Sequence, residues 1–208
     1  MKRPLPTYFN NYITDIDGNE YYYVTIGTQQ WLVGNLKTTH YNDGTAIPNL
    51  IVNVDWAADT TGAYCWYDND IANKKVYGAL YNWYAVDNAH GLALDGWRIP
   101  SSSDYNTLIV FSGGALVAGG KLKEVGLINW NTPNIGAINI YDFTAVGGGR
   151  RTSVGSFLYL KNNSFYLTSI EFNATNSNFG QLGYNTAASA TGNITKAYGM
   201  SVRCMRDI

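Results

Sequence analysis

The sequence predicts an α+β fold in a single domain, and three observations lead to this prediction. Segments with the composition of strands lie at both ends of the 208-residue chain, whereas segments with helical periodicity lie in its middle. This order does not fit the alternating strands and helices of Rossmann or barrel enzymes. No stretch has the composition of a linker, and no repeat of fixed period occurs. We therefore expect an N-terminal arm over residues 1–14 and one domain over residues 15–208.

The first element expected in the domain is a β-hairpin. Residues 15–19 (DIDGN) have the Asp-Gly chemistry of a turn, and residues 21–26 have the composition of a strand. Residues 27–29 turn the chain again, so residues 30–33 are predicted to return as the antiparallel partner. Residues 35–62 contain Asn-Asp-Gly and Ile-Pro sequences typical of loops, and we expect them to be irregular.

Two helices are expected in the middle of the chain. Residues 76–87 (VYGALYNWYAVD) place apolar and aromatic side chains at helical spacing, so one helix face can bury them. A second helix is predicted to begin after Pro100, because residues 101–104 supply hydroxyl and carboxylate acceptors for the free amides of a first turn. Apolar residues then recur at spacings of three and four, until the glycine pair at 113–114 ends the helix.

The C-terminal part of the chain is predicted to be β-structure. Beyond residue 140, short segments rich in Thr, Tyr, Phe and Val alternate with Gly and Asn. Residues 201–205 alternate between polar and apolar side chains, and we expect this last strand to lie beside the opening hairpin. The fold predicted from the residues therefore has two helices, an antiparallel sheet and long loops.

The charge composition excludes several classes of partner. Lys and Arg number 14, Asp and Glu 15, and the net charge is −1, so neither nucleic acid nor an anionic membrane is an expected partner. No apolar run approaches the roughly 18 to 20 residues that span a bilayer, so no membrane insertion is expected. Polar residues follow the basic start of the chain at once, and from this we expect no export signal.

No motif predicts a metal or cofactor. His40 and His90 lie outside any metal-binding spacing. Residues 15–19 resemble part of a calcium loop, but the Glu at its twelfth position is missing, so a turn is the better interpretation. Residues 68–70 (DND) could likewise hold a hard cation in a loop, and this indication is equally weak. We expect no metal that takes part in catalysis, whereas a structural calcium stays open.

Catalytic motifs are also missing from the sequence. The glycine-rich stretch at residues 147–151 (GGGRR) lacks a P-loop lysine, so a tight crossing near an edge strand is the better interpretation. No Gly-x-Ser-x-Gly occurs, and Cys65 has no neighbouring His or Asn to activate it. A pair of carboxylates that approach only in space stays open. Cys65 and Cys204 can form one long-range disulfide or remain two buried thiols.

Residues 156–198 have an unusual composition. Lys161, Glu171 and Lys196 are their only charged residues, and Asn, Ser, Thr, Tyr, Phe and Gly dominate. One interpretation is a loop-rich β region in which Asn and Gly form turns. The other is a binding face, because antibody-like paratopes combine rigid aromatic contacts with adaptable neutral hydrogen bonds.

Five segments of the chain carry a recognisable pattern: residues 21–36 (YYYVTIGTQQWLVGNL), 63–84 (AYCWYDNDIANKKVYGALYNWY), 96–100 (GWRIP), 142–150 (DFTAVGGGR) and 200–207 (MSVRCMRD). Together, and in this order, they resemble the Fibrobacter succinogenes major paralogous domain. Two blocks depart from the family pattern: Trp-Trp-Ser-Ser-Thr-Glu is here residues 166–171 (YLTSIE), and Gly-Phe before SVRC is residues 199–200 (GM). The resemblance implies a C-type lectin-like fold, which relatives of formylglycine-generating enzymes share.

The resemblance also implies a function outside the cell. Such domains occur on secreted and surface proteins of Bacteroidetes and in their phages, and some resemble the variable proteins of diversity-generating retroelements. In those proteins the hypervariable residues precede the closing SVRC block, which here means residues 158–198. We therefore expect a non-enzymatic ligand-binding module, a phage receptor-binding or diversified variable protein that recognises a protein or glycan on a host bacterial surface.

Two alternatives remain at this point. One is a secreted adhesin or fimbrial-tip domain of a gut bacterium. The other is an oxidase related to formylglycine-generating enzymes, which needs two reactive cysteines in one cleft. We instead expect both cysteines in the buried scaffold, together with Leu80, Trp83, Trp97 and Pro100. The oligomeric state stays open.

The expected binding face lies within residues 156–198, and we expect its contacts to depend little on salt because it is nearly uncharged. Alternation along strands turns some of its side chains inward. The expected aromatic anchors are Tyr159, Phe165, Tyr166, Phe172, Phe179, Tyr184 and Tyr198. The expected hydrogen-bonding residues are Asn162, Asn173, Asn178, Asn185 and Asn193.

Overall fold

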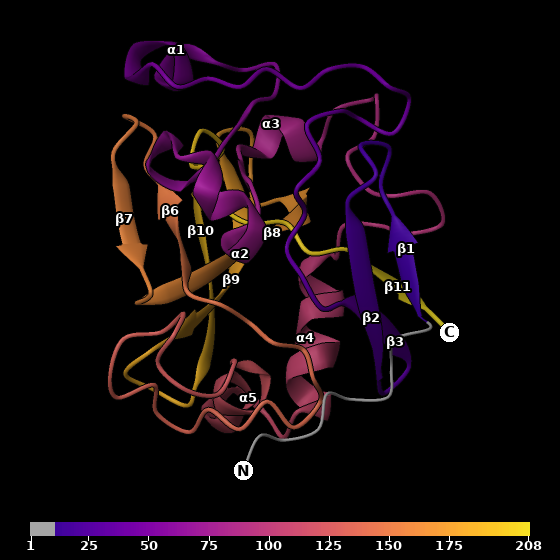
Figure 1. Cartoon of the computed structure of the whole chain (residues 1–208), viewed down its shortest axis with the longest axis vertical. Coiled ribbons are helices and arrows are strands. Elements are labelled where there is room, and N and C mark those ends of the chain that lie inside the picture. The colour runs from indigo at the N-terminus through magenta and orange to yellow at the C-terminus, as the bar shows by residue number, and fades with distance from the viewer. Residues whose placement is uncertain (1–10) are drawn as a thin grey trace.

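The computed structural model describes residues 11–208, and they form an α+β fold of short helices and mostly antiparallel strands (Figure 1). Residues 1–10 of the expected arm lie outside the described residues. Within the arm, strand β1 (Tyr12–Thr14) pairs antiparallel with β2 (Glu20–Ile26). The last residues of the expected arm are thus part of a sheet.

The opening hairpin and the last strand lie side by side, as the sequence predicts, although the strand is Met205–Asp207 and not residues 201–205. Strand β2 turns at Gly27 into β3 (Gln29–Leu32), and β11 (Met205–Asp207) pairs with β3 to complete the order β1-β2-β3-β11. The two ends of the described chain therefore meet in one sheet, on the right in Figure 1.

The second predicted helix is confirmed as α4 (Ser102–Phe111). The hydroxyl of Ser101 accepts from the amide of Asp104, and the carboxylate of Asp104 accepts from the amide of Ser101, which forms a capping box. Gly113 and Gly114 follow with φ of 96° and 92°, a conformation that favours glycine and ends the helix.

The predicted helix over residues 76–87 is wrong. The structure divides this segment into the end of α2 (Lys74–Tyr77), strand β5 (Leu80–Tyr81) and α3 (Trp83–Val86). Gly78 breaks the helix with φ of 73°, and a Cβ there would lie 2.6 Å from the carbonyl oxygen of Leu36. The aromatic residues still face the core. The periodicity therefore indicated which side chains are buried, but it did not indicate a continuous helix.

Further short elements bring the α-helices of the described residues to five, where the sequence predicted two. The expected irregular segment contains α1 (Asn53–Ala58) and is followed by β4 (Tyr64–Cys65), which pairs with β5. Two 3₁₀ turns, η1 (Tyr67–Asn69) and η2 (Ile71–Asn73), precede α2. The remaining helix, α5 (Ala115–Leu122), follows α4 directly.

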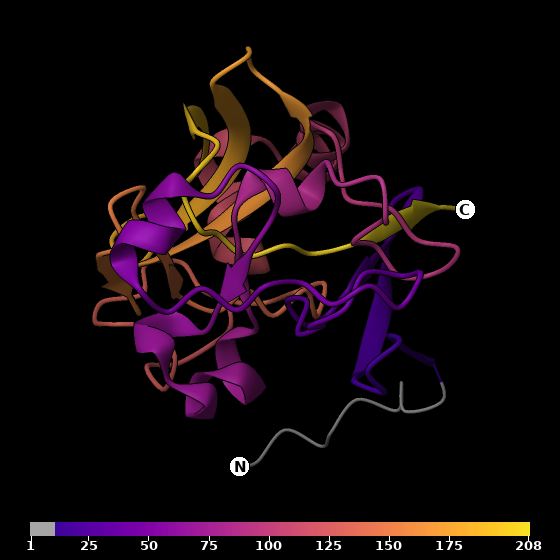
Figure 2. The same cartoon turned by 90° about the horizontal axis from the view of Figure 1, so that it is seen from above.

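The C-terminal region forms a three-stranded antiparallel sheet. Its strands are β8 (Asn163–Glu171), β9 (Asn176–Gly183) and β10 (Ser189–Thr195), in the order β10-β9-β8. The β8–β9 hairpin projects from the body of the domain (Figure 2). Beside the sheet, β6 (Gly148–Arg151) and β7 (Phe157–Leu160) form a separate hairpin.

Helices α4 and α5 cover one face of this sheet. Tyr105 of α4 lies so close to Gly180 of β9 that a Cβ on the glycine would come within 2.3 Å of the tyrosine ring. At the other edge of β8, Ser201 forms a parallel bridge with Tyr166, and Met200 bridges to Tyr81 of β5. The C-terminal sheet is thereby joined to the core strands β4 and β5.

The residues predicted to form the scaffold are buried. Leu80, Trp83 and Trp97 are 1%, 3% and 8% exposed. Cys65 and Cys204 are buried free thiols that belong to separate hydrophobic clusters. Along residues 11–208, no helix combines the length and the apolar character that crossing a bilayer requires.

Candidate functional site

Four of the twelve expected binding residues meet around an arginine that the sequence did not single out. The guanidinium carbon of Arg150 lies 5.2 Å, 4.7 Å and 5.1 Å from the ring centroids of Tyr159, Phe165 and Tyr198. Phe179 extends the group, with its ring centroid 5.9 Å from that of Phe165. We call these five residues the arginine cluster.

Different elements bring these side chains together. Arg150 lies on β6, Tyr159 on β7, Phe165 on β8 and Phe179 on β9, while Tyr198 follows β10. Most of the chain's β-rich half therefore contributes to the cluster. Its rings differ in exposure: Tyr159 is 43% exposed, Phe165 is 2% exposed, and Phe179 and Tyr198 are half-buried. Phe165 forms the floor and Tyr159 the most accessible wall.

A local twist of the β6–β7 hairpin positions Tyr159. Gly149 has φ of 64° and Tyr159 φ of 69°, so both adopt the left-handed conformation, which a residue with a side chain adopts at a cost. A Cβ at position 149 would lie 2.6 Å from the carbonyl oxygen of Leu158. Glycine is thus required on one strand while tyrosine is held in an unfavourable conformation on the other, with its ring 6.0 Å from that of Phe165.

No carboxylate of residues 11–208 forms an ion pair with the guanidinium of Arg150. Its Nε is buried and has no hydrogen-bond partner. Seven buried side-chain polar atoms of the described residues lack a partner, and this Nε is the only one that belongs to a charged group. None of the five ion pairs found along residues 11–208 includes Arg150. The cluster therefore combines a cation without a counter-ion and partly exposed aromatic rings.

Two expected anchors are not on the surface, and their assignment as ligand contacts is corrected. Phe165 and Tyr166 are each 2% exposed, because strand β8 is covered on both faces. Phe165 packs into the central core beneath the cluster. Tyr166 points to the opposite face, where it packs with the second core group and lies 6.1 Å from the ring of Phe143. Phe165 can support a ligand only from below, and Tyr166 cannot reach one.

Five of the seven remaining expected residues lie at the two ends of the C-terminal sheet. Phe172 (57% exposed) and Asn173 lie at the tip of the β8–β9 hairpin, and the oxygen of Asn173 accepts from backbone amides of the turn. At the other end lie Asn162, Tyr184 and Asn185. Strand β8 separates these ends by about 26 Å at roughly 3.3 Å per residue, so one small ligand cannot contact both.

Asn178 and Asn193 lie on the strands between these ends. The side-chain amide of Asn178 donates to the carbonyl of Ile170, and the side-chain oxygen of Asn193 accepts from Asn176. Asn193 is exposed and Asn178 is half-buried. Both side chains thus already take part in contacts within the sheet.

The two thiols do not form a reactive pair. Burial raises the pKa of Cys65 and of Cys204 to about 12, so both are protonated at neutral pH. They also lie in different clusters of the core. Along residues 11–208, no group of three or more His, Cys, Asp or Glu side chains is placed to hold a metal ion.

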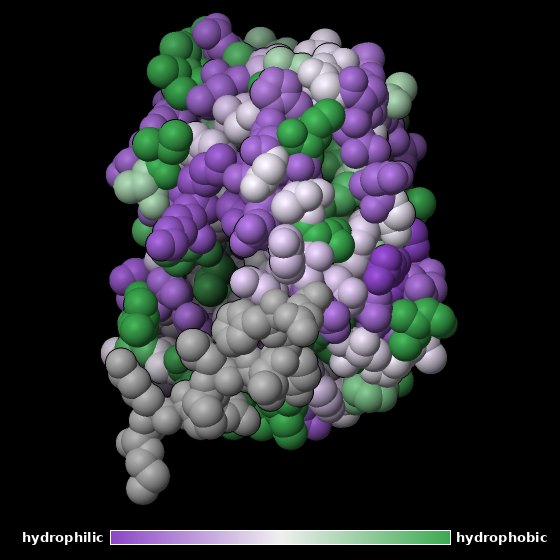
Figure 3. Space-filling model, turned by 45° about the vertical axis from the view of Figure 1, so that its right-hand side comes forward, coloured by the Kyte–Doolittle hydropathy of each residue, from purple (hydrophilic) through white to green (hydrophobic). Residues whose placement is uncertain are grey.

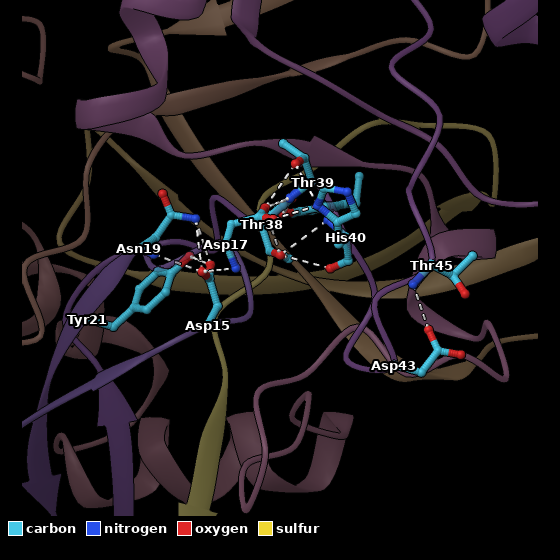
Figure 4. Close-up of polar contacts among 10 residues, drawn as sticks. Asp15, Asp17, Asn19, Tyr21, Thr38, Thr39, His40, Asp43 and Thr45 are labelled. Atoms are coloured by element: carbon cyan, nitrogen blue, oxygen red, sulfur yellow. Dashed lines mark hydrogen bonds and ion pairs between the residues drawn. The ribbon is translucent and has the colours of Figure 1, made fainter.

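The loop at residues 15–19 is a turn, as predicted, and its carboxylates are occupied by protein donors (Figure 4). Asp15 accepts from the side chain of Asn19 and from the hydroxyl of Tyr21. Asp17 accepts from Thr39 and lies 2.5 Å from Nδ1 of His40. Partial burial raises the pKa of Asp17, but these hydrogen bonds outweigh that effect and hold the pKa below its usual value.

A second His–Asp pair borders an open groove of about 600 Å³ beside residues 90–99. Nδ1 of His90 lies 2.5 Å from Asp43, whose pKa is lowered to about 2, first by the backbone hydrogen bond from Thr45 and then by His90. The side of the molecule that carries β1 and β2 shows hydrophobic residues in small groups among hydrophilic ones (Figure 3). Both histidines are paired with an aspartate, whereas Arg150 lies in no ion pair of the described residues, so the arginine cluster is the stronger candidate site.

Sequence reasoning assigned residues 147–151 to a crossing and thereby missed Arg150. One signal was present. Adjacent residues on a strand point to opposite faces, so only one of two consecutive arginines can point into the core. The other then has to lie on a second surface, and the aromatic residues at 159 and 165 come shortly after it in the chain.

Comparison with known proteins identifies a family. The sequence model described as the Fibrobacter succinogenes major domain matches residues 24–206, nearly the whole chain. This confirms the resemblance read from the five sequence blocks. No curated protein and no solved structure matches the chain.

Proposed function

The chain belongs to the Fibrobacter succinogenes major domain family, and from this premise we propose that it is a non-enzymatic module that binds its ligand at the arginine cluster. One observation carries the proposal. A cation without a counter-ion lies among aromatic rings that remain partly exposed, although nearly every other charged group in the interior is paired or hydrogen-bonded. Aromatic and arginine side chains dominate the binding energy of many interfaces.

The proposal includes the C-type lectin-like fold and a location outside the cell. Residues 158–198 correspond to the part that varies in the variable proteins of diversity-generating retroelements, and they contain Tyr159, Phe165, Phe179 and Tyr198. The ligand would be carried by a bacterial surface, with the domain on a phage particle. A bacterial adhesin would use the same cluster. A reverse-transcriptase gene beside a near-copy of the segment encoding residues 156–204, differing at adenines, distinguishes the diversified protein.

A catalytic role related to formylglycine-generating enzymes has less support. That chemistry needs two reactive thiols in one cleft. Here both thiols are buried in separate clusters, and burial raises the pKa of each. The physical features of the molecule thus favour recognition over thiol chemistry.

The experiment compares single substitutions in binding to intact cells. Labelled protein is titrated onto a panel of Bacteroidetes strains, and the apparent Kd is measured on strains that retain it. Tyr159→Ala and Tyr198→Ala should each weaken binding at least tenfold, because truncation of an aromatic anchor at a hot spot costs about 2 kcal/mol or more. Tyr12→Ala is the matched control, since Tyr12 is 51% exposed and lies on the distant strand β1.

A further variant tests the competing surface. Phe172→Ala removes the exposed aromatic ring at the tip of the β8–β9 hairpin and should leave binding unchanged. If Phe172→Ala weakens binding while Tyr159→Ala and Tyr198→Ala do not, the ligand binds at the hairpin tip and the proposal fails. Circular dichroism and urea unfolding of every variant establish that the fold is retained.

A further inference from the structure

We propose, resting on the proposed function, that the arginine cluster takes an acidic sugar residue. The guanidinium of Arg150 would pair with the sugar's carboxylate, and the rings of Tyr159 and Tyr198 would contact the sugar ring. The observations that carry this inference are the charge state of the cluster, the shape of the guanidinium and the small size of the surface.

The cluster has one positive charge and no negative one. The only acidic residue among residues 156–198 is Glu171, and its carboxylate lies 2.5 Å from the ammonium of Lys196. None of the ion pairs found along residues 11–208 includes Arg150, and its guanidinium is partly desolvated by the three rings around it. A partly desolvated charge attracts a counter-ion more strongly than a fully hydrated one does.

A carboxylate matches the guanidinium better than other anions do. The planar guanidinium donates two parallel hydrogen bonds to the two oxygens of a carboxylate. Its Nε is buried and has no acceptor, so a bound carboxylate would pair with the two terminal nitrogens of the guanidinium. Phosphate carries more charge and is usually held by several donors or cations. Arg150 is the single cation of this cluster, which suits a single charge.

The surroundings favour a sugar over an acidic protein segment. Stable protein interfaces bury about 800 Å² on each partner and use some 20–30 residues. The cluster has five members, and one of them, Phe165, is fully buried. A pyranose ring presents an apolar face that matches an aromatic side chain, and the hydroxyls of Tyr159 and Tyr198 can exchange hydrogen bonds with sugar hydroxyls.

This inference changes the expected effect of salt. The nearly neutral composition of residues 156–198 predicts binding that is insensitive to salt. A single ion pair at the centre of the site instead predicts that affinity falls a few-fold between low salt and about 0.5 M salt, because exposed charges are screened over a Debye length of roughly 4–5 Å there.

The test uses a defined probe. The full chain is titrated with galacturonic acid trisaccharide, and binding is followed by calorimetry and by shifts of amide signals in NMR spectra. We expect saturable binding that weakens at least fivefold in Arg150→Gln, partly recovers in Arg150→Lys, and weakens in Tyr159→Ala. Lys161→Gln is the matched control, because it removes a neighbouring positive charge outside the cluster.

Three outcomes separate this inference from the proposed function. Equal binding of the neutral galactose trisaccharide, or Arg150→Gln binding like the wild type, overturns the acidic-sugar inference while the cluster remains a binding site. Saturable binding of a glutamate-rich peptide, with none of the trisaccharide, also overturns it. If Tyr159→Ala and Tyr198→Ala retain full binding to cells, the proposed function itself fails.

Discussion

Arg150 and Arg151 are neighbours on strand β6, yet the regions around them are built in opposite ways. The side chain of Arg151 is fully buried, and its guanidinium stacks on Trp56 at 4.5 Å. Every nitrogen of that guanidinium donates a hydrogen bond. Its acceptors are the carbonyls of Leu50, Ile51 and Gly155 and the side-chain oxygen of Asn53. Arg150 is half-buried and its Nε has no acceptor.

The comparison distinguishes an arginine whose donors are all satisfied within the scaffold from one whose Nε has no acceptor. Arg203 and Lys123 follow the pattern of Arg151. Arg203 donates to Asn35 and to the carbonyl of Phe143, and Lys123 donates to three backbone carbonyls. Buried cations without a carboxylate partner thus hold loops in place here, provided that their donors are satisfied. Arg150 is the exception.

The largest expected effect is the loss of Arg151. Arg151→Met keeps most of the side-chain volume but removes four charge-assisted hydrogen bonds and the stacking of the guanidinium on Trp56, so the free energy of unfolding should fall by about 3–5 kcal/mol. Urea unfolding measures the difference. A change below about 1 kcal/mol would show that Arg151 does not hold residues 50–53 as the structure indicates. Arg151 would then not be a scaffold residue, and its contrast with Arg150 would fail.

Within the cluster itself, the floor and the wall should respond differently. Phe165→Ala removes a buried ring and should cost about 3–4 kcal/mol of stability, as large-to-small core substitutions do. Tyr159→Ala truncates a ring that is 43% exposed and should cost less than about 1 kcal/mol. Thermal and urea unfolding of both variants check this. Comparable losses in the two variants would make the cluster part of the core.

Local signals predicted much of the fold, whereas contacts between distant segments decided the rest. The β2–β3 hairpin and α4 follow from the turn at residues 27–29 and from the pairing of Ser101 with Asp104, all within a few residues. The break at Gly78 depends on the backbone of Leu36, which lies 42 residues earlier. No periodicity within residues 76–87 contains that information.

The composition of the sequence indicated the region of the candidate site, but it did not indicate how the side chains of that region are arranged. The density of Tyr and Asn pointed to this region, and in the structure Tyr159 and Tyr198 both lie close to the guanidinium of Arg150. Strand β8 is buried on both faces, however, so alternation could not show that Phe165 and Tyr166 are core residues. The role of Arg150 depends on rings from three other segments, which only the folded chain brings together.

The pH dependence of stability tests whether another buried cation, Lys123, belongs to the scaffold. Burial lowers the pKa of Lys123 from 10.5 to about 8, so between these values the unfolded chain binds more protons than the folded one, and this residue's contribution to stability rises with pH. The loss of stability in Lys123→Met should therefore grow by roughly 1–2 kcal/mol from pH 8 to pH 10.5. The raised pKa values of the two buried thiols lower stability as pH rises. Both thiols are present in the wild type and in Lys123→Met, so their effect cancels in the comparison. Urea unfolding at both pH values measures the change, and a loss that shrinks as pH rises contradicts the lowered pKa.

The smallest expected effect is the most informative for Arg150. Arg150→Met should change the free energy of unfolding by less than about 1 kcal/mol in either direction. The methionine can occupy the space between the rings of Tyr159 and Tyr198, and sulfur–aromatic contacts offset part of the lost cation–π attraction. The substitution also removes a buried Nε that has no acceptor, which is favourable.

Urea unfolding of Arg150→Met beside Arg151→Met gives the direct contrast. A near-neutral change at position 150 and a severe one at position 151 would mean that the fold does not require the charge of Arg150. A loss at Arg150 as large as that at Arg151 would instead assign both arginines to the scaffold.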